Sequence, residues 1–125
     1  MRSIYCALGA INNALRKKQK YIYISYTKNN YLLCKLFFNE GYLYLYTIHN
    51  NYILIEFNSY EDRNILNGLR IFKNRSRRNC FNNNNLYIES IKKKKKYLLL
   101  TTLGLCFSSY ALKNQLGGIA LAELY

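Results

Sequence analysis

Apolar residues recur at helical spacing near the start of the chain. They fall on one face of a helix, because side chains three and four positions apart lie above one another. Ser3 precedes this face and is expected to cap the helix, which should end near Arg16. The apolar residues of the face are Ile4, Leu8, Ile11 and Leu15.

Strand and helix patterns then alternate as far as residue 57. The expected elements are a strand over 21–26, a helix from a Thr27 cap to 40–41, and strands over 42–47 and 52–57. His49 is interpreted as a residue of the turn between the last two strands. The order helix–strand–helix–strand–strand predicts an N-terminal α/β lobe over 1–66.

The second half predicts a lobe over 67–125 that is mostly β with one short helix. Arg70 alternates with apolar neighbours in its strand and should project from the opposite face. Gly117 and Gly118 are expected to stop the short helix, since glycine commonly follows a helix end. The expected elements are a strand over 68–72, a basic loop over 73–85, a strand or short helix over 86–91, a strand over 98–100, a turn over 101–104, a helix over 108–115 and a strand over 119–125. The fold class is therefore α+β with two small lobes, and a basic insertion lies near 73–96.

Charge is the strongest global signal in the composition. The chain has 19 lysines and arginines against 6 acidic residues, a formal net charge of +13. Such a surplus on a small protein favours a polyanionic partner, nucleic acid first and an anionic membrane second, over a merely basic protein. The candidate phosphate-binding residues by charge are Arg75, Arg77, Arg78, Lys92, Lys93, Lys94, Lys95 and Lys96.

The chemistry-bearing residues do not form a catalytic or metal-binding pattern. The cysteines are scattered without a Cys-x-x-Cys pair, and there is one histidine, so neither a zinc site nor another cofactor is expected. The acidic residues are dispersed and no nucleophile stands with a base, which argues against an enzyme. We interpret the cysteines as reduced, buried thiols. They are Cys6, Cys34, Cys80 and Cys106.

An uncharged run over 97–112, flanked by lysines, offers an alternative function. It raises the hypothesis of a basic membrane-associated protein. A spanning helix needs about 20 mostly apolar residues, and this run is shorter and contains threonines and serines. The alternative is therefore less favoured than nucleic-acid binding.

Several short motifs occur along the chain in an order that is typical of one family. Thr101-Thr102-Leu103-Gly104 is followed by eleven residues and then by Leu116-Gly117-Gly118, while 68–72 reads Gly-Leu-Arg-Ile-Phe. Upstream, the chain has Ile11-x-Asn13, Thr27-Lys28 and Glu40-Gly41. This order and spacing resemble the eighth protein of the small ribosomal subunit. Leu100 stands where that family usually has a serine, and Ile119 where bacterial members often have glutamate.

The resemblance implies a structural constituent of the small ribosomal subunit that supports assembly and translation. Its partners would be small-subunit rRNA and neighbouring ribosomal proteins, with no small-molecule substrate and no membrane. In the family the hydroxyl-and-glycine turn and the double glycine lie against the minor groove of an irregular RNA helix. The RNA-contacting residues that the resemblance implies are Thr101, Thr102, Gly104, Gly117, Gly118, Lys28 and Arg70.

Amino-acid usage bears on where the protein is made. The chain is rich in Asn, Lys, Tyr, Ile, Leu and Phe and lacks Pro and Trp. The favoured residues have AT-rich codons, which points to an organellar genome. The chain also starts with helix-forming sequence instead of an Arg- and Ser-rich leader. We therefore expect a mitochondrial ribosome, with the plastid as the alternative.

Overall fold

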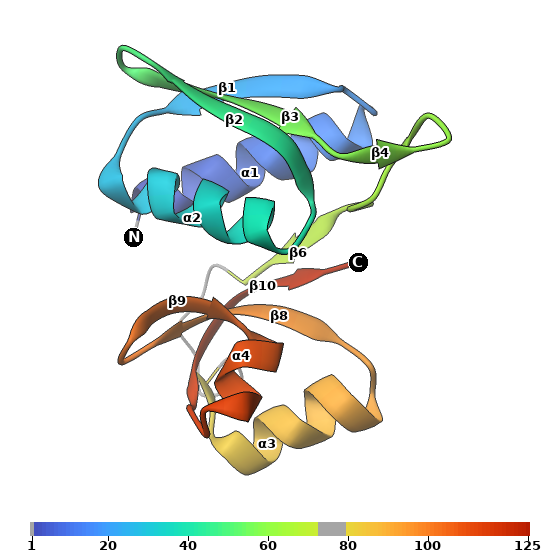
Figure 1. Ribbon diagram of the computed structural model, residues 1–125. Coiled ribbons are helices and arrows are strands. Elements are labelled where there is room, and N and C mark those ends of the chain that lie inside the picture. Colours follow the sequence, from blue (N-terminus) through green and yellow to red (C-terminus); the bar gives the residue numbers. More distant parts are fainter. Residues whose placement is uncertain (1, 73–79) are drawn as a thin grey trace. The chain divides into compact units, whose positions relative to one another are not determined.

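The computed structural model describes residues 2–72 and 80–125 (Figure 1). The chain divides into two compact units, Met1–Gly68 and Leu69–Tyr125. Each contains helices and antiparallel strands, which confirms the α+β class. The predicted loop over 73–85 lies outside the described residues as far as residue 79, and so do its three arginines.

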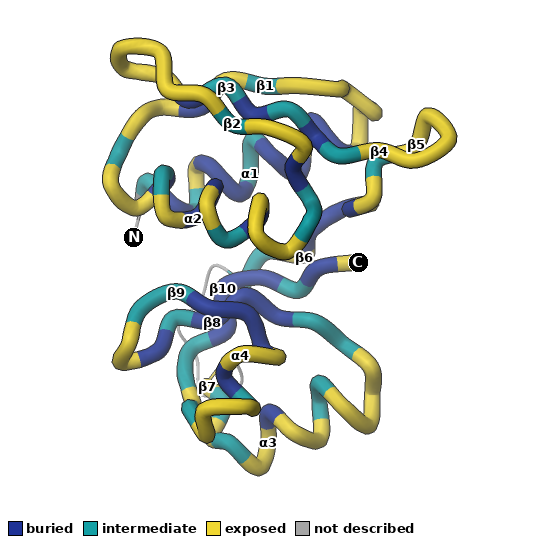
Figure 2. The backbone as a smooth tube through the Cα atoms, in the orientation of Figure 1, coloured by how far each residue is buried: buried dark blue, intermediate teal, exposed yellow. Residues whose placement is uncertain are grey.

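The first unit is a three-stranded antiparallel sheet covered by two helices on one face (Figure 1). The strand order is β1-β3-β2, so β3 is central, and a two-stranded hairpin follows. Buried residues concentrate between the sheet and the helices, while the turns are exposed (Figure 2). Its elements are α1 (Arg2–Arg16), β1 (Tyr21–Ser25), α2 (Lys28–Asn39), β2 (Leu43–His49), β3 (Tyr52–Phe57), β4 (Ser59–Tyr60) and β5 (Arg63–Asn64).

Helix α1 forms because its apolar face is buried. All four predicted apolar positions are at most 4% exposed, so each contributes roughly 1.5–3 kcal/mol of hydrophobic burial. The helix already includes Arg2, which places Ser3 inside its first turn. The prediction that Ser3 caps this helix is therefore wrong, because a capping residue must precede the first helical residue.

Helix α2 has the cap that the sequence predicts. The Thr27 hydroxyl accepts a hydrogen bond from the backbone N–H of Asn30 at 3.0 Å, and the helix ends at a Glu40 cap. Gly41 follows with φ +86°, a left-handed conformation that glycine adopts without strain.

The β2–β3 hairpin places one predicted turn residue in a strand. His49 pairs with Tyr52 at the end of the ladder, so the turn consists of Asn50 and Asn51. Asn50 takes φ +51°, a left-handed conformation that asparagine tolerates better than most residues with a side chain. The assignment of His49 to the turn is therefore wrong by one position.

The second unit is an antiparallel sheet with helices packed on one face. The main sheet has the order β6-β10-β8-β9, and β7 also pairs with β10. Its buried cluster joins α3, β8, β9, α4 and β10 through Leu86, Tyr97, Leu99, Cys106, Ala111 and Ala120. The elements are β6 (Leu69–Ile71), β7 (Cys80–Phe81), α3 (Asn83–Tyr87), the π-helix η2 (Ile88–Lys92), β8 (Lys96–Thr101), β9 (Gly104–Phe107), α4 (Ser108–Lys113) and β10 (Gly118–Leu124).

The asparagine run is helical where the sequence predicts a loop. Asn82 caps α3 by accepting the backbone N–H of Asn85 at 2.8 Å. Leu86 is fully buried in the cluster and holds this helix against the sheet. The loop prediction is therefore wrong over 80–85. Cys80–Phe81 pair with β10 as β7, and after them capping and burial outweigh the weak helix propensity of asparagine. Of the two alternatives predicted for 86–91, a strand or a short helix, the structure shows helix.

Helix α4 ends without the help of glycine. The backbone N–H of Leu116 donates to the Ala111 carbonyl at 2.8 Å, and that of Gln115 donates to Leu112 at 3.3 Å. These bonds form a Schellman motif in which Gln115, at φ +55°, takes the left-handed position usually held by glycine. The double glycine lies beyond this motif, so the prediction that it stops the helix is wrong.

Two of the four cysteines predicted to be buried are buried in the structure. Cys34 and Cys106 are buried, whereas Cys6 and Cys80 are exposed. Burial raises the pKa of the Cys34 thiol to about 12. The prediction of buried thiols therefore holds for the first pair and is wrong for the second.

The uncharged run over 97–112 does not form one helix, because it is divided among β8, β9 and the start of α4. Among the helices of the described residues, none has both the length and the apolar composition that a membrane span requires.

Candidate RNA-binding surface

The turn between β8 and β9 is held by the hydroxyl of Thr101. This oxygen donates to the carbonyl of Gly104 at 2.9 Å and accepts the backbone N–H of Leu103 at 3.2 Å. The Thr101 side chain is buried, with 9% of the residue exposed. Its hydroxyl therefore fixes the shape of the turn, and its donor is already used inside the protein.

The two residues at the tip of the turn face solvent. Thr102 is exposed, and Leu103 is 72% exposed. Gly104 takes φ +109°, where a side chain would be strained, although a Cβ added there would meet no other atom within 4 Å. The sequence motifs do not single out Leu103, although its place inside the turn was the available signal. The turn thus presents one hydroxyl, one apolar side chain and exposed backbone.

The double glycine allows backbones to approach one another closely. A Cβ on Gly117 would lie 2.6 Å from the Phe81 carbonyl oxygen, and one on Gly118 would lie 2.5 Å from that of Leu100. A Cβ on Gly118 would also come within 3.1 Å of the Thr101 methyl group. The structure therefore brings the double glycine and the threonine turn together, as the family resemblance implies. It also gives both glycines a packing role that is independent of any ligand.

Two departures from the family pattern face each other in this region. Leu100 on β8 and Ile119 on β10 are direct partners in the antiparallel ladder. An apolar pair therefore stands where the family pattern would place a serine opposite a glutamate. Cross-strand apolar pairs stabilise a sheet, so the two departures fit one another structurally.

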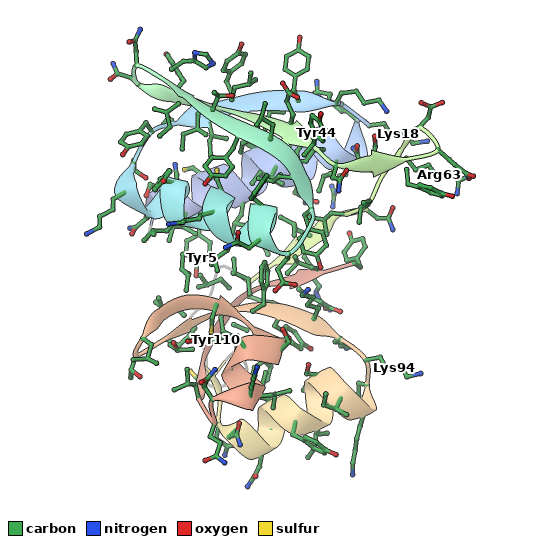
Figure 3. The ribbon with its side chains drawn as sticks, viewed as in Figure 1. Tyr5, Lys18, Tyr44, Arg63, Lys94 and Tyr110 are labelled. Atoms are coloured by element: carbon green, nitrogen blue, oxygen red, sulfur yellow. The ribbon has the colours of Figure 1, made fainter. Side chains whose placement is uncertain are left out.

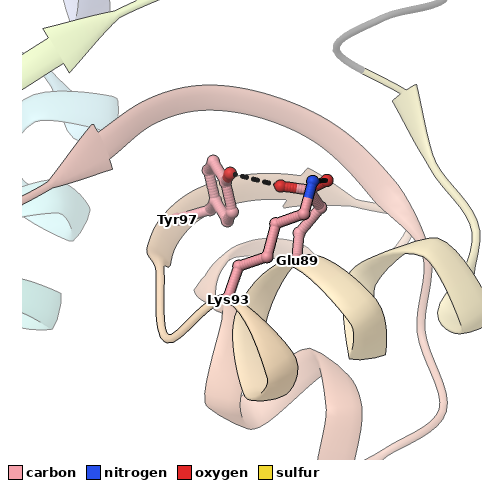
Figure 4. A network of polar contacts seen from close by, with 3 residues as sticks. All are labelled: Glu89, Lys93 and Tyr97. Carbon is pink, nitrogen blue, oxygen red and sulfur yellow. Dashed lines mark hydrogen bonds and ion pairs between the residues drawn. The ribbon is translucent and has the colours of Figure 1, made fainter.

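The lysine run divides into paired and exposed members. Lys93 Nζ contacts Glu89 Oε1 at 2.9 Å, and Tyr97 Oη donates to Glu89 Oε2 at 3.2 Å (Figure 4). The hydrogen bond from Lys93 lowers the pKa of the Glu89 carboxyl, while burial and the nearby carboxylate raise the pKa of the Tyr97 phenol. Lys96 Nζ lies 5.0 Å from the centre of the Phe107 ring, in the range of a cation–π contact.

The remaining lysines of the run differ in exposure. Lys92 ends the π-helix and is exposed, and Lys95 is half-buried after it. Lys94 has φ +55° and extends away from the turn before β8 (Figure 3). The local surface is thus cationic: Lys92, Lys93 and Lys94 are exposed, and of these three Lys93 is paired with Glu89.

The other predicted contacts are distributed over the chain. Arg70 is exposed on β6, where it pairs in register with Glu123 and its guanidinium lies 5.6 Å from the Phe72 ring centre. It projects from the opposite face to buried Leu69, as predicted. Lys28 begins α2 in the first unit and is exposed. The predicted arginines of the loop lie outside the described residues.

This surface suits binding better than covalent chemistry. It offers a hydroxyl, backbone N–H and C=O groups and ammonium groups, all of which can contact phosphates and 2′-hydroxyls. Over 2–72 and 80–125 no three histidine, cysteine or acidic side chains gather where they could hold a metal ion.

Comparison with known proteins identifies the family. The family model described as ribosomal protein S8 matches residues 3–125, almost the whole chain. None of the curated proteins compared with the chain matches it. The matched region includes both units and therefore covers the turn, the double glycine and the lysine run. The chain belongs to the ribosomal protein S8 family, whose members are structural components of the small ribosomal subunit that bind rRNA and neighbouring ribosomal proteins.

Proposed function

We propose that this chain binds folded small-subunit rRNA through the surface formed by the β8–β9 turn and the start of β10, and so supports subunit assembly and translation. The observation that carries the proposal is the fixed turn. Thr101 holds it from within, which leaves Thr102 and the neighbouring backbone presented without further rearrangement. A preorganised surface loses less conformational entropy on binding than a flexible one.

Recognition would depend on RNA shape more than on base sequence. The minor groove of an RNA helix is wide and shallow and displays 2′-hydroxyls. Thr102 can donate to and accept from such groups, while exposed Gly117 lets RNA approach the backbone. In this proposal Thr101 and Gly118 position the surface instead of contacting RNA, because both are occupied by packing within the protein.

Affinity would come mainly from cations, including the lysine run that precedes β8 at the end of the strand opposite the turn. Each lysine that neutralises a phosphate releases counterions and steepens the salt dependence by roughly 0.7–0.9 log units. Lys92 and Lys94 are the strongest candidates in the run, since Lys93 pairs with Glu89. Arg75, Arg77 and Arg78 remain proposed contacts on charge alone. Lys28 and Arg70 remain proposed contacts because of the family resemblance, and both are exposed.

The experiment is a filter-binding titration of the full chain against a helical fragment of small-subunit rRNA. Thr102→Ala should weaken binding about tenfold, the effect of losing one good hydrogen bond, without changing the salt slope. Thr102→Ser, which keeps the hydroxyl, is the matched control and should bind nearly as the native chain does. Equal binding by all three proteins would contradict the assignment of the turn.

We also propose that the ribosome in question is organellar, mitochondrial in preference to plastid. The support is the excess of residues with AT-rich codons, including Asn, Lys, Tyr and Ile. The test is gradient sedimentation of ribosomal subunits from purified mitochondria and plastids of the source organism, with the fractions probed by an antibody to the chain. Co-migration with the mitochondrial small subunit is expected, and recovery from cytosolic ribosomes alone would refute it.

A further inference from the structure

Strand β1 leaves one edge of its sheet open. It is the terminal strand in the order β1-β3-β2, and it lies at the margin of the sheet beside α1 (Figure 1). The backbone N–H of Phe57 donates to Lys20 at 2.9 Å, and that of Tyr26 donates to Asn51 at 2.7 Å. In an antiparallel ladder the bonded positions alternate. The bonds at Lys20 and Tyr26 therefore place Ile22 and Ile24 among the bonded residues.

The alternate residues direct their backbone groups away from the sheet. By the same alternation, the N–H and C=O groups of Tyr21, Tyr23 and Ser25 point to the outer side of β1. On that side Asn30 Nδ2 donates to the Ser25 carbonyl at 3.0 Å. Within the described residues, no hydrogen-bond partner meets the outward groups of Tyr21 and Tyr23. The edge therefore offers two residues with both donor and acceptor open, and a third with its donor open.

Between Tyr21 and Ser25 this edge lacks three of the usual protections against pairing. Exposed edges are normally blunted by proline, by a charged side chain or by a bulge. The segment Tyr21–Ser25 contains neither proline nor charge, and its register with β3 runs without a shift. An unprotected β-branched and aromatic edge is a template for a further strand.

A groove beside the edge can receive side chains of that strand. It has a volume of about 620 Å³ and lies between α1 and β1. Its helix wall is built from small residues, Ala7, Ala10 and Cys6, and Ile24 lies on the strand side. Small residues leave room for larger apolar side chains from a partner.

The charges around the edge select the partner. Lys20 precedes β1 and Lys28 follows it, and both are exposed. Neither α1 nor β1 contributes a negative charge, and on the neighbouring strand β3 the register partner of Tyr21 is Glu56. A second copy of the chain fits this site poorly, because two molecules of net charge +13 repel one another. RNA lacks the regular alternation of donors and acceptors that a strand edge requires.

We propose that the open edge of β1 binds an extended segment of another protein by strand addition, and that this segment is apolar at alternate positions with acidic residues at its ends. The inference extends the proposed function by giving the first unit a protein partner, and it leaves the RNA surface of the second unit unchanged. Main-chain hydrogen bonds to Tyr21 and Tyr23 supply the affinity, while the groove and the flanking lysines supply the selectivity.

The test is a nuclear magnetic resonance titration of the full, ¹⁵N-labelled chain with synthetic peptides. The probe is a strand of alternating valine and threonine between terminal glutamates, compared with the same strand between terminal lysines. The glutamate peptide should shift the amides of Tyr21, Tyr23 and Ser25 and protect them from solvent exchange. It should bind at least about tenfold more tightly than the lysine peptide.

Two variants, each with its own control, locate the binding site. Tyr23→Pro removes an outward N–H without removing a bond to β3, so it should weaken peptide binding about tenfold, whereas Tyr23→Thr should not. Ala10→Lys fills the groove while adding a favourable charge, and it should also weaken binding. Asn13→Lys, on an exposed position of α1, is its control. The second pair decides the matter even if the proline variant does not fold.

The proposal is overturned if neither peptide shifts these amides, or if Ala10→Lys and Asn13→Lys bind the glutamate peptide equally. It is also overturned if the chain forms dimers through β1, or if the rRNA fragment protects Tyr21 and Tyr23. Binding of the rRNA fragment by Ala10→Lys is measured in parallel. Retained RNA binding with lost peptide binding separates this site from the RNA surface.

Discussion

Lys92 and Lys94 should set the salt dependence of RNA binding more strongly than Lys93 does. All three lysines are exposed, but the Lys93 ammonium is already paired with Glu89 at 2.9 Å. If Lys92 and Lys94 each neutralise one phosphate, replacing both by glutamine lowers the slope of log K against log salt by about 1.4 to 1.8. Provided the affinities converge at 1 M salt, binding at 0.1 M falls about 25- to 60-fold.

The assay is a series of equilibrium titrations with a small-subunit rRNA fragment between 0.05 and roughly 0.5 M potassium chloride, a range over which such slopes are linear. Lys93→Gln is the matched control, because it removes the same charge from the same run. The slope of log K against log salt for Lys93→Gln should differ from the native slope by less than half of the change expected for one phosphate contact. The reasoning is refuted if Lys93→Gln lowers the slope as much as Lys92→Gln or Lys94→Gln does.

Three further outcomes follow from packing and ionisation. Gly118→Ala should lower the free energy of unfolding by about 1–3 kcal/mol, since the added Cβ would meet a carbonyl oxygen of β8 at 2.5 Å. Gly9→Ala, in open space within α1, should raise it by about 0.5–1 kcal/mol. Thermal unfolding measures both variants, and destabilisation by both would contradict the packing argument. The lowered pKa of Glu89 means that its stabilisation is present above the pKa of the unfolded carboxyl and is lost as pH falls, so Glu89→Gln should make melting temperature less sensitive to acid between pH 7 and roughly 3; an unchanged pH profile would refute this. Iodoacetamide at about pH 8, near the ordinary thiol pKa, should modify exposed Cys6 and spare Cys34, because burial raises the pKa of the Cys34 thiol to about 12. Mass spectrometry of the folded and denatured chain measures the modification. Rapid modification of Cys34 in the folded chain would count against its burial.

Local signals in the sequence were sufficient for much of the fold. The apolar face of α1 and the cap at Thr27 depend on residues within a few positions of one another, so one stretch of sequence contains the whole cause. The β8–β9 turn was predictable for the same reason, because glycine and two threonines occur together there. Propensity, capping and periodicity agree at each of these places.

Tertiary contacts decided the places where prediction failed. The asparagine run has weak helix propensity, but Leu86 is drawn into a cluster whose other members come from distant strands and α4. The double glycine is required by the carbonyls of Phe81 and Leu100, neither of which is near it in sequence. No local rule contains these contacts, so the sequence pattern assigned both segments to more familiar roles.

The candidate site was predictable as a region but not atom by atom. The family resemblance placed Thr101, Thr102 and Gly118 in one area, and the structure brings them together. Sequence could not show that the Thr101 hydroxyl turns inward or that Lys93 is paired, because both depend on side-chain direction. These two observations reduce the proposed direct contacts and sharpen the variants that test them.

Directed cleavage of rRNA from the tip of the β8–β9 turn tests the central proposal most directly. A hydroxyl-radical source is attached through Leu103→Cys in a chain whose exposed cysteines, Cys6 and Cys80, are replaced by serine. After assembly into small subunits, cuts should occur on both strands of one irregular rRNA helix, across its minor groove. Cleavage absent from rRNA, with the turn instead cross-linking to protein or lipid, would contradict the account.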